Sequence, residues 1–299
     1  MKTGTTVIFA ALLCSAPLLA QPLGVTREMI NTTLPLEGAP LAETGPYEVV
    51  SESTFGKTGL VVYRPATLDA FPANDTLPVM VWGNGGCAID NPNYAGFLGT
   101  IASHGFLVLN TAASEEGPAR ATAEILLSAI DWAEAENTRN GSPLAGKINV
   151  EQVAVMGTSC SGMLSIAAGT DPRVDTIGVF NAGTQPPAEG APAGATSTET
   201  LKQVRGSILF INGSERDFMT PASHDNFMRV DHVQTFYGAR HGAGHMATMY
   251  HPGGGEFANV IWHWLRYQFK EDTEAGSWFT GENCGLCTNE NWDADSSKM

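Results

Sequence analysis

The segment that most constrains the fold of this chain is residues 153–163, which read VAVMGTSCSGM. A β-branched apolar run typical of a buried strand is followed by small residues and then by the start of an apolar helix. A serine at the crest of such a turn is a nucleophile elbow, because the small residues let strand and helix approach closely. The usual pattern is G-x-S-x-G, and Ser161 stands at the fifth position here. An ordinary strand–turn–helix is therefore the alternative to Ser159 as a nucleophile.

Strand-like and helix-like segments alternate along most of the chain. Two short alternating segments at 47–54 and 59–65 are typical of an antiparallel pair. Besides the elbow strand, we expect central strands at 77–82, 106–110, 174–180, 207–212 and 233–237, and helices at 93–103, 119–137 and 256–270. This order predicts an α/β chain with a mostly parallel, doubly wound sheet and antiparallel N-terminal strands.

The chain divides into four predicted segments. Residues 1–20 have the charge, apolar run and small-residue end of a signal peptide, so we expect a secreted protein. Residues 21–45 form an N-terminal arm, residues 46–272 the catalytic domain, and residues 273–299 a C-terminal tail. With 43% hydrophobic residues in 299, the chain can bury one sizeable core, and no apolar run is long enough to span a membrane.

Charge and histidine placement narrow the classes of ligand. The formal net charge of −15 argues against binding to nucleic acid or to anionic membranes. No two histidines stand with a carboxylate at metal-binding spacing on one helix face, so we expect no catalytic metal and no cofactor. Of the histidines outside the proposed site, His263 is expected on a helical or connecting surface. We expect a monomer that acts on a small-molecule or polymeric substrate.

An elbow serine needs a base to take its proton and an acid to orient that base. In the α/β-hydrolase arrangement they follow in the order serine, acid, histidine. Asp217 follows the strand at 207–212 and is the predicted acid; Glu215 is its local competitor, and a helix-capping aspartate is the alternative reading of the turn. The predicted base is His245, because Gly242 and Gly244 give its loop the freedom to reach Ser159. His241 is the alternative base.

Two backbone N–H groups should form an oxyanion hole. One belongs to Cys160, the residue after the nucleophile, and the other to Cys87 or Gly86 in the small-residue segment 83–87. Donors that surround one oxygen lie within disulfide range of each other, so we hypothesise a Cys87–Cys160 disulfide. Two buried free thiols are the alternative. Cys284 and Cys287 are close in sequence and predict a second, local disulfide in the tail.

Segments distributed over residues 46–290 resemble the secreted α/β-hydrolases grouped around dienelactone hydrolases and bacterial cutinases or polyester hydrolases. They are residues 79–87 (VMVWGNGGC), 101–109 (IASHGFLVL), 156–162 (MGTSCSG) and 212–221 (NGSERDFMTP), with the glycine-rich stretch to His245 and the final helix. The resemblance implies the α/β-hydrolase fold and a triad of Ser159, Asp217 and His245, with Cys87 and Cys160 as oxyanion donors. The chain departs from the pattern at these two cysteines, where the polyester hydrolases usually carry an aromatic residue and a methionine. It also has Asn181 near the place of a tryptophan.

The sequence thus predicts a secreted serine hydrolase that cleaves carboxylic esters through an acyl-enzyme. A lactonase of the dienelactone type, or a tailoring hydrolase of one small molecule, uses the same triad and is the first alternative. A non-catalytic binding protein on this scaffold is the second, and the intact order of serine, acid and histidine argues against it.

Overall fold

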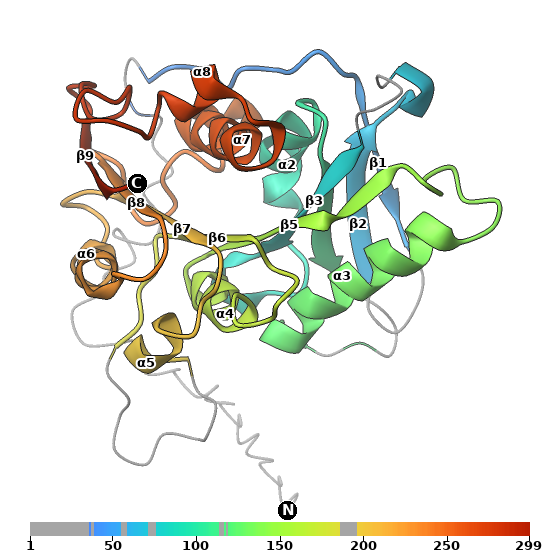
Figure 1. Cartoon of the computed structure of the whole chain (residues 1–299), viewed down its shortest axis with the longest axis horizontal. Helices are drawn as coiled ribbons and strands as arrows, with labels where there is room; N and C mark the ends of the chain where they lie inside the picture. Colours follow the sequence, from blue (N-terminus) through green and yellow to red (C-terminus); the bar gives the residue numbers. More distant parts are fainter. Residues whose placement is uncertain are drawn as a thin grey trace, which may run out of the picture.

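A computed structural model describes residues 36, 39–54, 59–70, 76–113, 117, 119–185 and 196–299. The predicted signal peptide and most of the predicted N-terminal arm lie outside these residues. The described residues form one nine-stranded sheet in the order β1-β2-β4-β3-β5-β6-β7-β8-β9 (Figure 1). Its strands are β1 Val49–Ser53, β2 Gly59–Pro65, β3 Leu77–Gly83, β4 Leu107–Ala112, β5 Ile148–Thr158, β6 Thr176–Phe180, β7 Ser207–Gly213, β8 Thr235–Arg240 and β9 Trp292–Lys298.

Strands β4, β3, β5, β6, β7 and β8 run parallel, whereas β1 and β2 join one edge in antiparallel pairs. This arrangement confirms the predicted fold class. The structure adds one strand that the sequence pattern did not predict. Strand β9, inside the predicted tail 273–299, pairs antiparallel with β8 and extends the opposite edge of the sheet.

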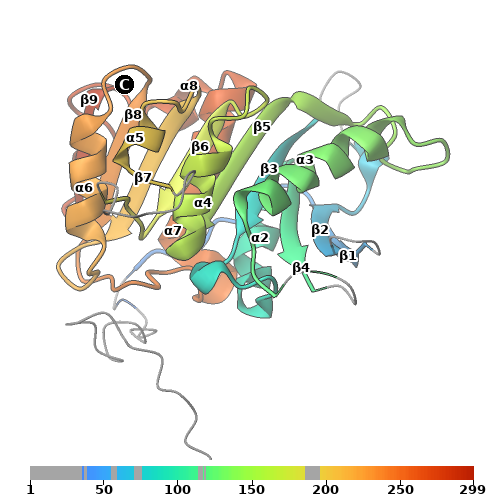
Figure 2. The ribbon, with the colours of Figure 1, turned by 90° about the horizontal axis from the view of Figure 1, so that it is seen from below.

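Helices cover both faces of the sheet (Figures 1 and 2). On one face lie α3, α4, α6 and the short α5, and on the other face lie α2 and α7, with α8 packed on α7. Their bounds are α2 Ala95–Ala102, α3 Ala123–Thr138, α4 Cys160–Ala168, α5 Thr198–Leu201, α6 Thr220–Arg229, α7 Gly255–Lys270 and α8 Thr273–Gly276.

The central strands supply two cores because alternate side chains point to opposite faces of a sheet. In β3, Val79 and Val81 pack with α3 and α4, whereas Met80 and Trp82 pack with α2 and α7. These four side chains are completely buried. The nearly continuous apolar runs of the central strands thus follow from burial on both faces.

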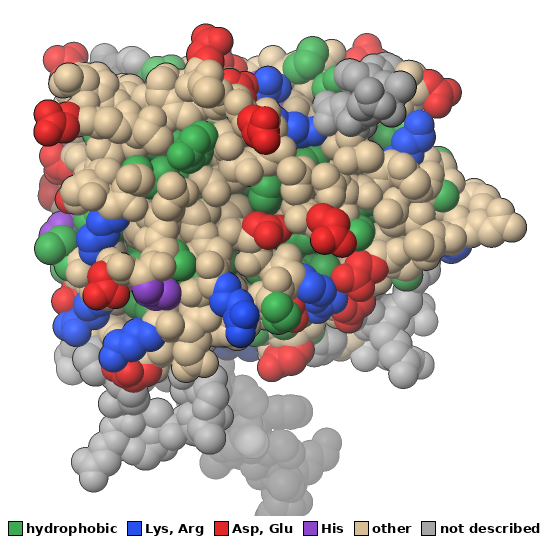
Figure 3. Space-filling model, viewed as in Figure 1, with side chains coloured by type: hydrophobic (Ala, Val, Ile, Leu, Met, Phe, Trp, Pro, Cys, Tyr) green, Lys and Arg blue, Asp and Glu red, His purple; other side chains and the backbone are tan. Residues whose placement is uncertain are grey.

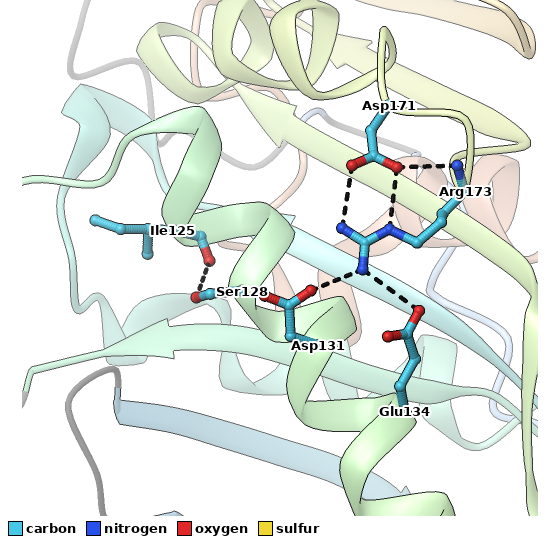
Figure 4. A network of polar contacts seen from close by, with 6 residues as sticks. All are labelled: Ile125, Ser128, Asp131, Glu134, Asp171 and Arg173. Carbon is cyan, nitrogen blue, oxygen red and sulfur yellow. Dashed lines mark hydrogen bonds and ion pairs between the residues drawn. The ribbon is translucent and has the colours of Figure 1, made fainter.

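A polar network joins α3 to the turn after α4 (Figure 4). The Arg173 guanidinium donates to both carboxylate oxygens of Asp171, and its third nitrogen lies 2.7 Å from Asp131 Oδ1 and 3.3 Å from Glu134 Oε1. Asp131 and Glu134 belong to α3. The network therefore fixes α3 relative to the turn that leads from the elbow helix to β6.

Buried polar contacts tie α7 and β9 to β8. Arg240 Nε donates to Glu256 Oε2 over 2.6 Å, and the two side chains are each 6% exposed. Trp292 Nε1 donates to the other oxygen of Glu256 over 3.3 Å. At the far end of β9, Lys298 Nζ donates to the Phe227 and Val230 carbonyls at the end of α6. These contacts hold the tail against the domain, and the Cys284–Cys287 disulfide closes a short loop within the tail.

The expectation that His263 lies on a helix surface is wrong. Its residue is 7% exposed, because α8 and Trp278 cover this side of α7. The His263 imidazole stacks on the rings of Trp262 and Trp278, at centroid distances of 3.4 and 3.7 Å. The His104 ring in turn stacks on Trp262, with centroids 4.1 Å apart. Burial lowers the pKa of His263 to about 4.

Candidate active site

Four parallel strands end at one edge of the sheet, and the candidate residues lie in the segments that follow them. Ser159 comes directly after β5, and Asn181 directly after β6. Asp217 and His245 follow β7 and β8 after short loops. Because the carboxyl ends of parallel strands meet at the same edge, residues far apart in the sequence are brought together there.

Ser159 occupies the sharp turn between β5 and α4. Its backbone has φ 56° and ψ −121°, a conformation that L-residues rarely adopt and that costs about 1–3 kcal/mol when the surroundings impose it. The Ser159 N–H donates to the Phe180 carbonyl over 2.8 Å, which holds the turn on β6. A Cβ on Gly157 would lie 2.5 Å from the Ser161 carbonyl oxygen, so only glycine fits at this position.

The serine at the fifth position of the elbow is accommodated by β3. Ser161 is completely buried, and a Cβ placed on Gly83 would lie 2.6 Å from its Cβ. The missing side chain at Gly83 therefore makes room for the atoms that a glycine at 161 would lack. The departure from G-x-S-x-G changes the packing behind the turn and leaves its shape intact.

Ser159, His245 and Asp217 form a continuous hydrogen-bonded chain. His245 Nε2 lies 2.9 Å from Ser159 Oγ, and His245 Nδ1 lies 2.8 Å from Asp217 Oδ1. With the Nδ1 proton donated to the carboxylate, Nε2 is free to accept the serine hydroxyl proton. Asp217 and His245 are 2% and 4% exposed, so the hydrogen bond between these two side chains is shielded from water.

Three further groups hold the acid and the imidazole. Asn181 Nδ2 donates to Asp217 Oδ2 over 2.8 Å, and the Met219 N–H donates to Asp217 Oδ1 over 3.1 Å. The ring of Phe218 stacks on the His245 imidazole with centroids 4.4 Å apart. No sequence pattern predicted a role for any of these three groups. Their position next to Asp217 and at the end of β6 was the available signal.

The loops that carry the acid and the base pack directly on each other. The Ser214 N–H donates to the Ala243 carbonyl over 3.3 Å, and Arg216 forms a parallel bridge with Gly244. A Cβ on Gly213 would lie 2.4 Å from the Ala243 oxygen, so the close approach depends on glycine there. The separation of Asp217 and His245 is thus fixed by backbone contacts as well as by their own hydrogen bond.

The two alternative residues lie elsewhere. His241 is 42% exposed in its side chain, and its Nε2 lies 3.0 Å from Asp293 Oδ1, near the start of β9. Glu215 is exposed at the surface of the acid loop, and hydrogen bonds from its own N–H and from Ser214 lower the pKa of its carboxyl. The structure brings His245 and Asp217 to Ser159 and leaves His241 and Glu215 outside this chain of hydrogen bonds.

Cys87 and Cys160 are joined by a disulfide, with their Cα atoms 5.2 Å apart. Cys160 is the first residue of α4, so its N–H is one of the amides for which the helix supplies no carbonyl partner. Cys87 ends the short 3₁₀ turn Gly85–Cys87 after β3 and has φ 51°. The bond therefore connects the loop after β3 to the N-terminus of the elbow helix, beside Ser159.

In the described part of the chain, no group of three or more His, Cys, Asp or Glu side chains is arranged to hold a metal ion. No helix in that part is both long and apolar enough to cross a bilayer.

The comparison with known families decides the membership of this chain. A sequence model described as PET hydrolase-like matches residues 35–291, which is most of the chain. The chain belongs to the PET hydrolase-like family. This membership confirms the resemblance to cutinase-like polyester hydrolases and identifies the chain as a hydrolase of the α/β-hydrolase superfamily. No curated protein matches it.

Proposed function

We propose that this chain is a secreted serine hydrolase that cleaves carboxylic esters through an acyl-enzyme, with Ser159 as nucleophile, His245 as general base and Asp217 as the acid that orients it. The observation that carries the proposal is the hydrogen-bonded chain from Ser159 Oγ through His245 to Asp217, with distances of 2.9 and 2.8 Å. These distances are within the range needed for proton transfer between a nucleophile and its base.

In the first half of the reaction, Ser159 Oγ attacks the ester carbonyl carbon while His245 Nε2 takes the hydroxyl proton. The carbonyl oxygen becomes an oxyanion, and the N–H groups of Cys87 and Cys160 donate to it. The positive end of the α4 dipole adds to this stabilisation. The protonated imidazole is stabilised by the buried carboxylate of Asp217. It then donates its proton to the alcohol oxygen, which leaves as the C–O bond breaks.

In the second half, a water molecule takes the place of the alcohol. His245 removes a proton from the water as its oxygen attacks the acyl-enzyme carbonyl. The same two N–H groups receive the second oxyanion. Collapse of this intermediate breaks the bond to Ser159 Oγ, which regains its proton from His245, and releases the carboxylic acid.

Export and solution state are part of the proposal. Two disulfides fit an oxidising compartment, which agrees with export by the N-terminal signal. Acidic and basic side chains are interspersed on the face drawn in Figure 3, which agrees with a protein that does not bind nucleic acid or anionic membranes. We propose a monomer that meets its ester substrate, small or polymeric, in solution or at a polymer surface.

Membership in the family gives the strongest indication of the substrate class. Its description names PET hydrolases, which favours esters and polyesters over other substrates. The Cys87–Cys160 disulfide replaces two side chains next to the nucleophile, so the acyl pocket of this chain differs from the usual polyester-binding one. A graded panel of nitrophenyl esters, an amorphous aromatic polyester film and a set of lactones separates a general esterase from a polyesterase and from a lactonase.

The mechanism is tested with three variants assayed on a short-chain nitrophenyl ester. Ser159→Ala and His245→Ala are expected to lower kcat by about 10⁴-fold or more, since removal of either member disables the triad as a unit. His241→Ala serves as the matched control and is expected to keep wild-type turnover. A folded Ser159→Ala protein with unchanged turnover would overturn the proposal. A loss in Ser159→Ala and His241→Ala, with wild-type turnover in His245→Ala, would reassign the base. Failure of a fluorophosphonate probe to label Ser159 would favour a binding protein.

A further inference from the structure

The loop that carries the Cys87 N–H is held by contacts on three of its carbonyl oxygens. Arg120 Nη2 donates to the Gly86 carbonyl over 2.7 Å, and the Ala121 N–H donates to the Cys87 carbonyl over 2.9 Å. Asn84 Nδ2 donates to the Ala88 carbonyl over 3.1 Å. Arg120 also pairs with Ala88 in an antiparallel bridge, so the segment before α3 lies along the loop.

The contact of Arg120 determines the direction of one N–H group. The Gly86 carbonyl and the Cys87 N–H belong to the same peptide unit, which is planar and trans, so they point in opposite directions. A guanidinium bound to the carbonyl oxygen therefore fixes the N–H on the other side of the loop. The disulfide keeps Cys87 within 5.2 Å of Cys160, the residue that follows Ser159, measured between Cα atoms.

The disulfide alone does not fix this orientation. Gly86 has φ 67° and ψ 10°, and Cys87 has φ 51°, so a residue with a Cβ is held in the left-handed region. Rotation of the intervening peptide by about 180° carries φ of Cys87 to about −130°, which is comfortable for any residue. The same rotation carries ψ of Gly86 to about −170°, which at positive φ is open essentially to glycine alone. The flipped peptide is thus accessible, and in it the N–H points away from Ser159.

We propose that Arg120 is a positioning residue of the oxyanion hole: its guanidinium, bound to the Gly86 carbonyl, keeps the 86–87 peptide in the orientation that directs the Cys87 N–H at the substrate oxyanion. The inference rests on the proposed function and assigns to it a residue with no contact to the reacting atoms. A charge-assisted hydrogen bond on the carbonyl also polarises the peptide and strengthens the N–H as a donor.

The first test is the kinetics of Arg120 variants on a short-chain nitrophenyl ester. Loss of one oxyanion donor typically lowers kcat by about 10²–10³-fold, and Arg120→Ala permits the flip without removing the donor. We expect kcat to fall by about tenfold to a hundredfold with KM within about twofold of wild type. Arg120→Lys, which retains a charged donor, is expected to recover most of the loss. Arg139→Ala removes an exposed arginine bound to Glu136 at the end of α3 and is the matched control, with wild-type kinetics expected.

The second test removes the alternative peptide orientation. A Cβ on Gly86 meets no heavy atom within 4 Å, and alanine tolerates the observed left-handed conformation far better than the flipped one. The loss caused by Arg120→Ala is therefore expected to be several-fold smaller in a Gly86→Ala background. An equal loss in both backgrounds would contradict the flip, because a merely structural or electrostatic role of Arg120 does not depend on residue 86.

A tetrahedral analogue gives a readout independent of turnover. An alkylboronic acid forms a tetrahedral adduct on a catalytic serine, and its inhibition constant is expected to rise in Arg120→Ala by about the factor lost from kcat/KM. The Cys87–Cys160 bond is verified in each variant by peptide mapping without reduction. Wild-type kcat and inhibition in a folded Arg120→Ala protein would overturn this proposal while leaving the proposed function standing. If the wild-type enzyme itself cleaves no ester, the proposed function fails and takes the role of Arg120 with it.

Discussion

At the scale of single residues, the contact of Asn181 with Asp217 predicts an effect on turnover from a residue outside the proposed triad. Its side chain is completely buried, and Nδ2 donates to Asp217 Oδ2 over 2.8 Å. Asn181→Ala removes this donor and leaves a buried carboxylate oxygen without it, which costs about 1–3 kcal/mol and loosens the carboxylate that orients His245. We expect kcat to fall about tenfold with little change in KM, measured on a nitrophenyl ester. Asn149→Ala, which removes a half-buried amide contact to Gln152 far from the site, at the opposite end of β5, is the control. Wild-type kcat in a folded Asn181→Ala protein would contradict this role.

The residue scale also shows where sequence reasoning stops. The proposed nucleophile, acid and base could be placed because each follows a recognisable strand and belongs to a residue type that the chemistry needs. Asn181 also follows a predicted strand, but asparagine is not a residue type that the triad needs, and its contact with Asp217 depends on β6 lying beside β7 in the sheet. No sequence pattern indicates the proposed role of Arg120 either, because this role depends on a contact with the Gly86 carbonyl, 34 positions away in the sequence.

At the scale of elements, the buried ion pair between β8 and α7 predicts a large effect on stability. Arg240 and Glu256 are each 6% exposed, and Glu256 also accepts from Trp292 of β9. Glu256→Ala leaves the Arg240 charge buried without its partner, so we expect the free energy of unfolding to fall by about 3 kcal/mol or more. Urea denaturation measures this change. Glu199→Ala, in an exposed pair with Lys202, is expected to change it by less than about 1 kcal/mol. Equal effects of the two substitutions would show that the buried pair does not connect these elements.

The central strands and the edge strand β9 differ in how well the sequence predicts them. Strands β3 and β7, and residues 153–158 of β5, are buried on both faces and are recognisable from their apolar composition. Strand β9 reads WDADSSK, and only its first residue is buried, so no apolar pattern indicates it. It is a strand because β8 offers an open edge and because Trp292 and Lys298 anchor its two ends. Hydrophobic periodicity therefore does not predict an edge strand that is stabilised by backbone pairing and by side-chain contacts at its two ends.

At the scale of the whole molecule, the buried histidines link folding to pH. Burial lowers the pKa of His263 to about 4 from the ordinary histidine value of 6.5, and burial lowers the pKa of His104 as well. Of the charged groups near His263, Arg266 acts in the same direction as burial, and Asp272 opposes it. A histidine with a folded pKa below its unfolded one binds more protons when the chain unfolds. The free energy of unfolding therefore falls as pH drops from about 6.5 towards 4.

The size of this effect follows from the shift at His263. A folded pKa of about 4 against 6.5 in the unfolded chain corresponds to about 2 kcal/mol of stability lost between pH 7 and pH 5, and to about 3 kcal/mol by pH 4. His263→Phe keeps an aromatic ring between Trp262 and Trp278 but removes the titration. Urea denaturation of both proteins at pH 7 and pH 5 is expected to show a drop that is about 2 kcal/mol smaller in the variant. Parallel pH dependences of the two proteins would mean that the imidazole is protonated within the fold, and that the stack opens to water without unfolding the domain.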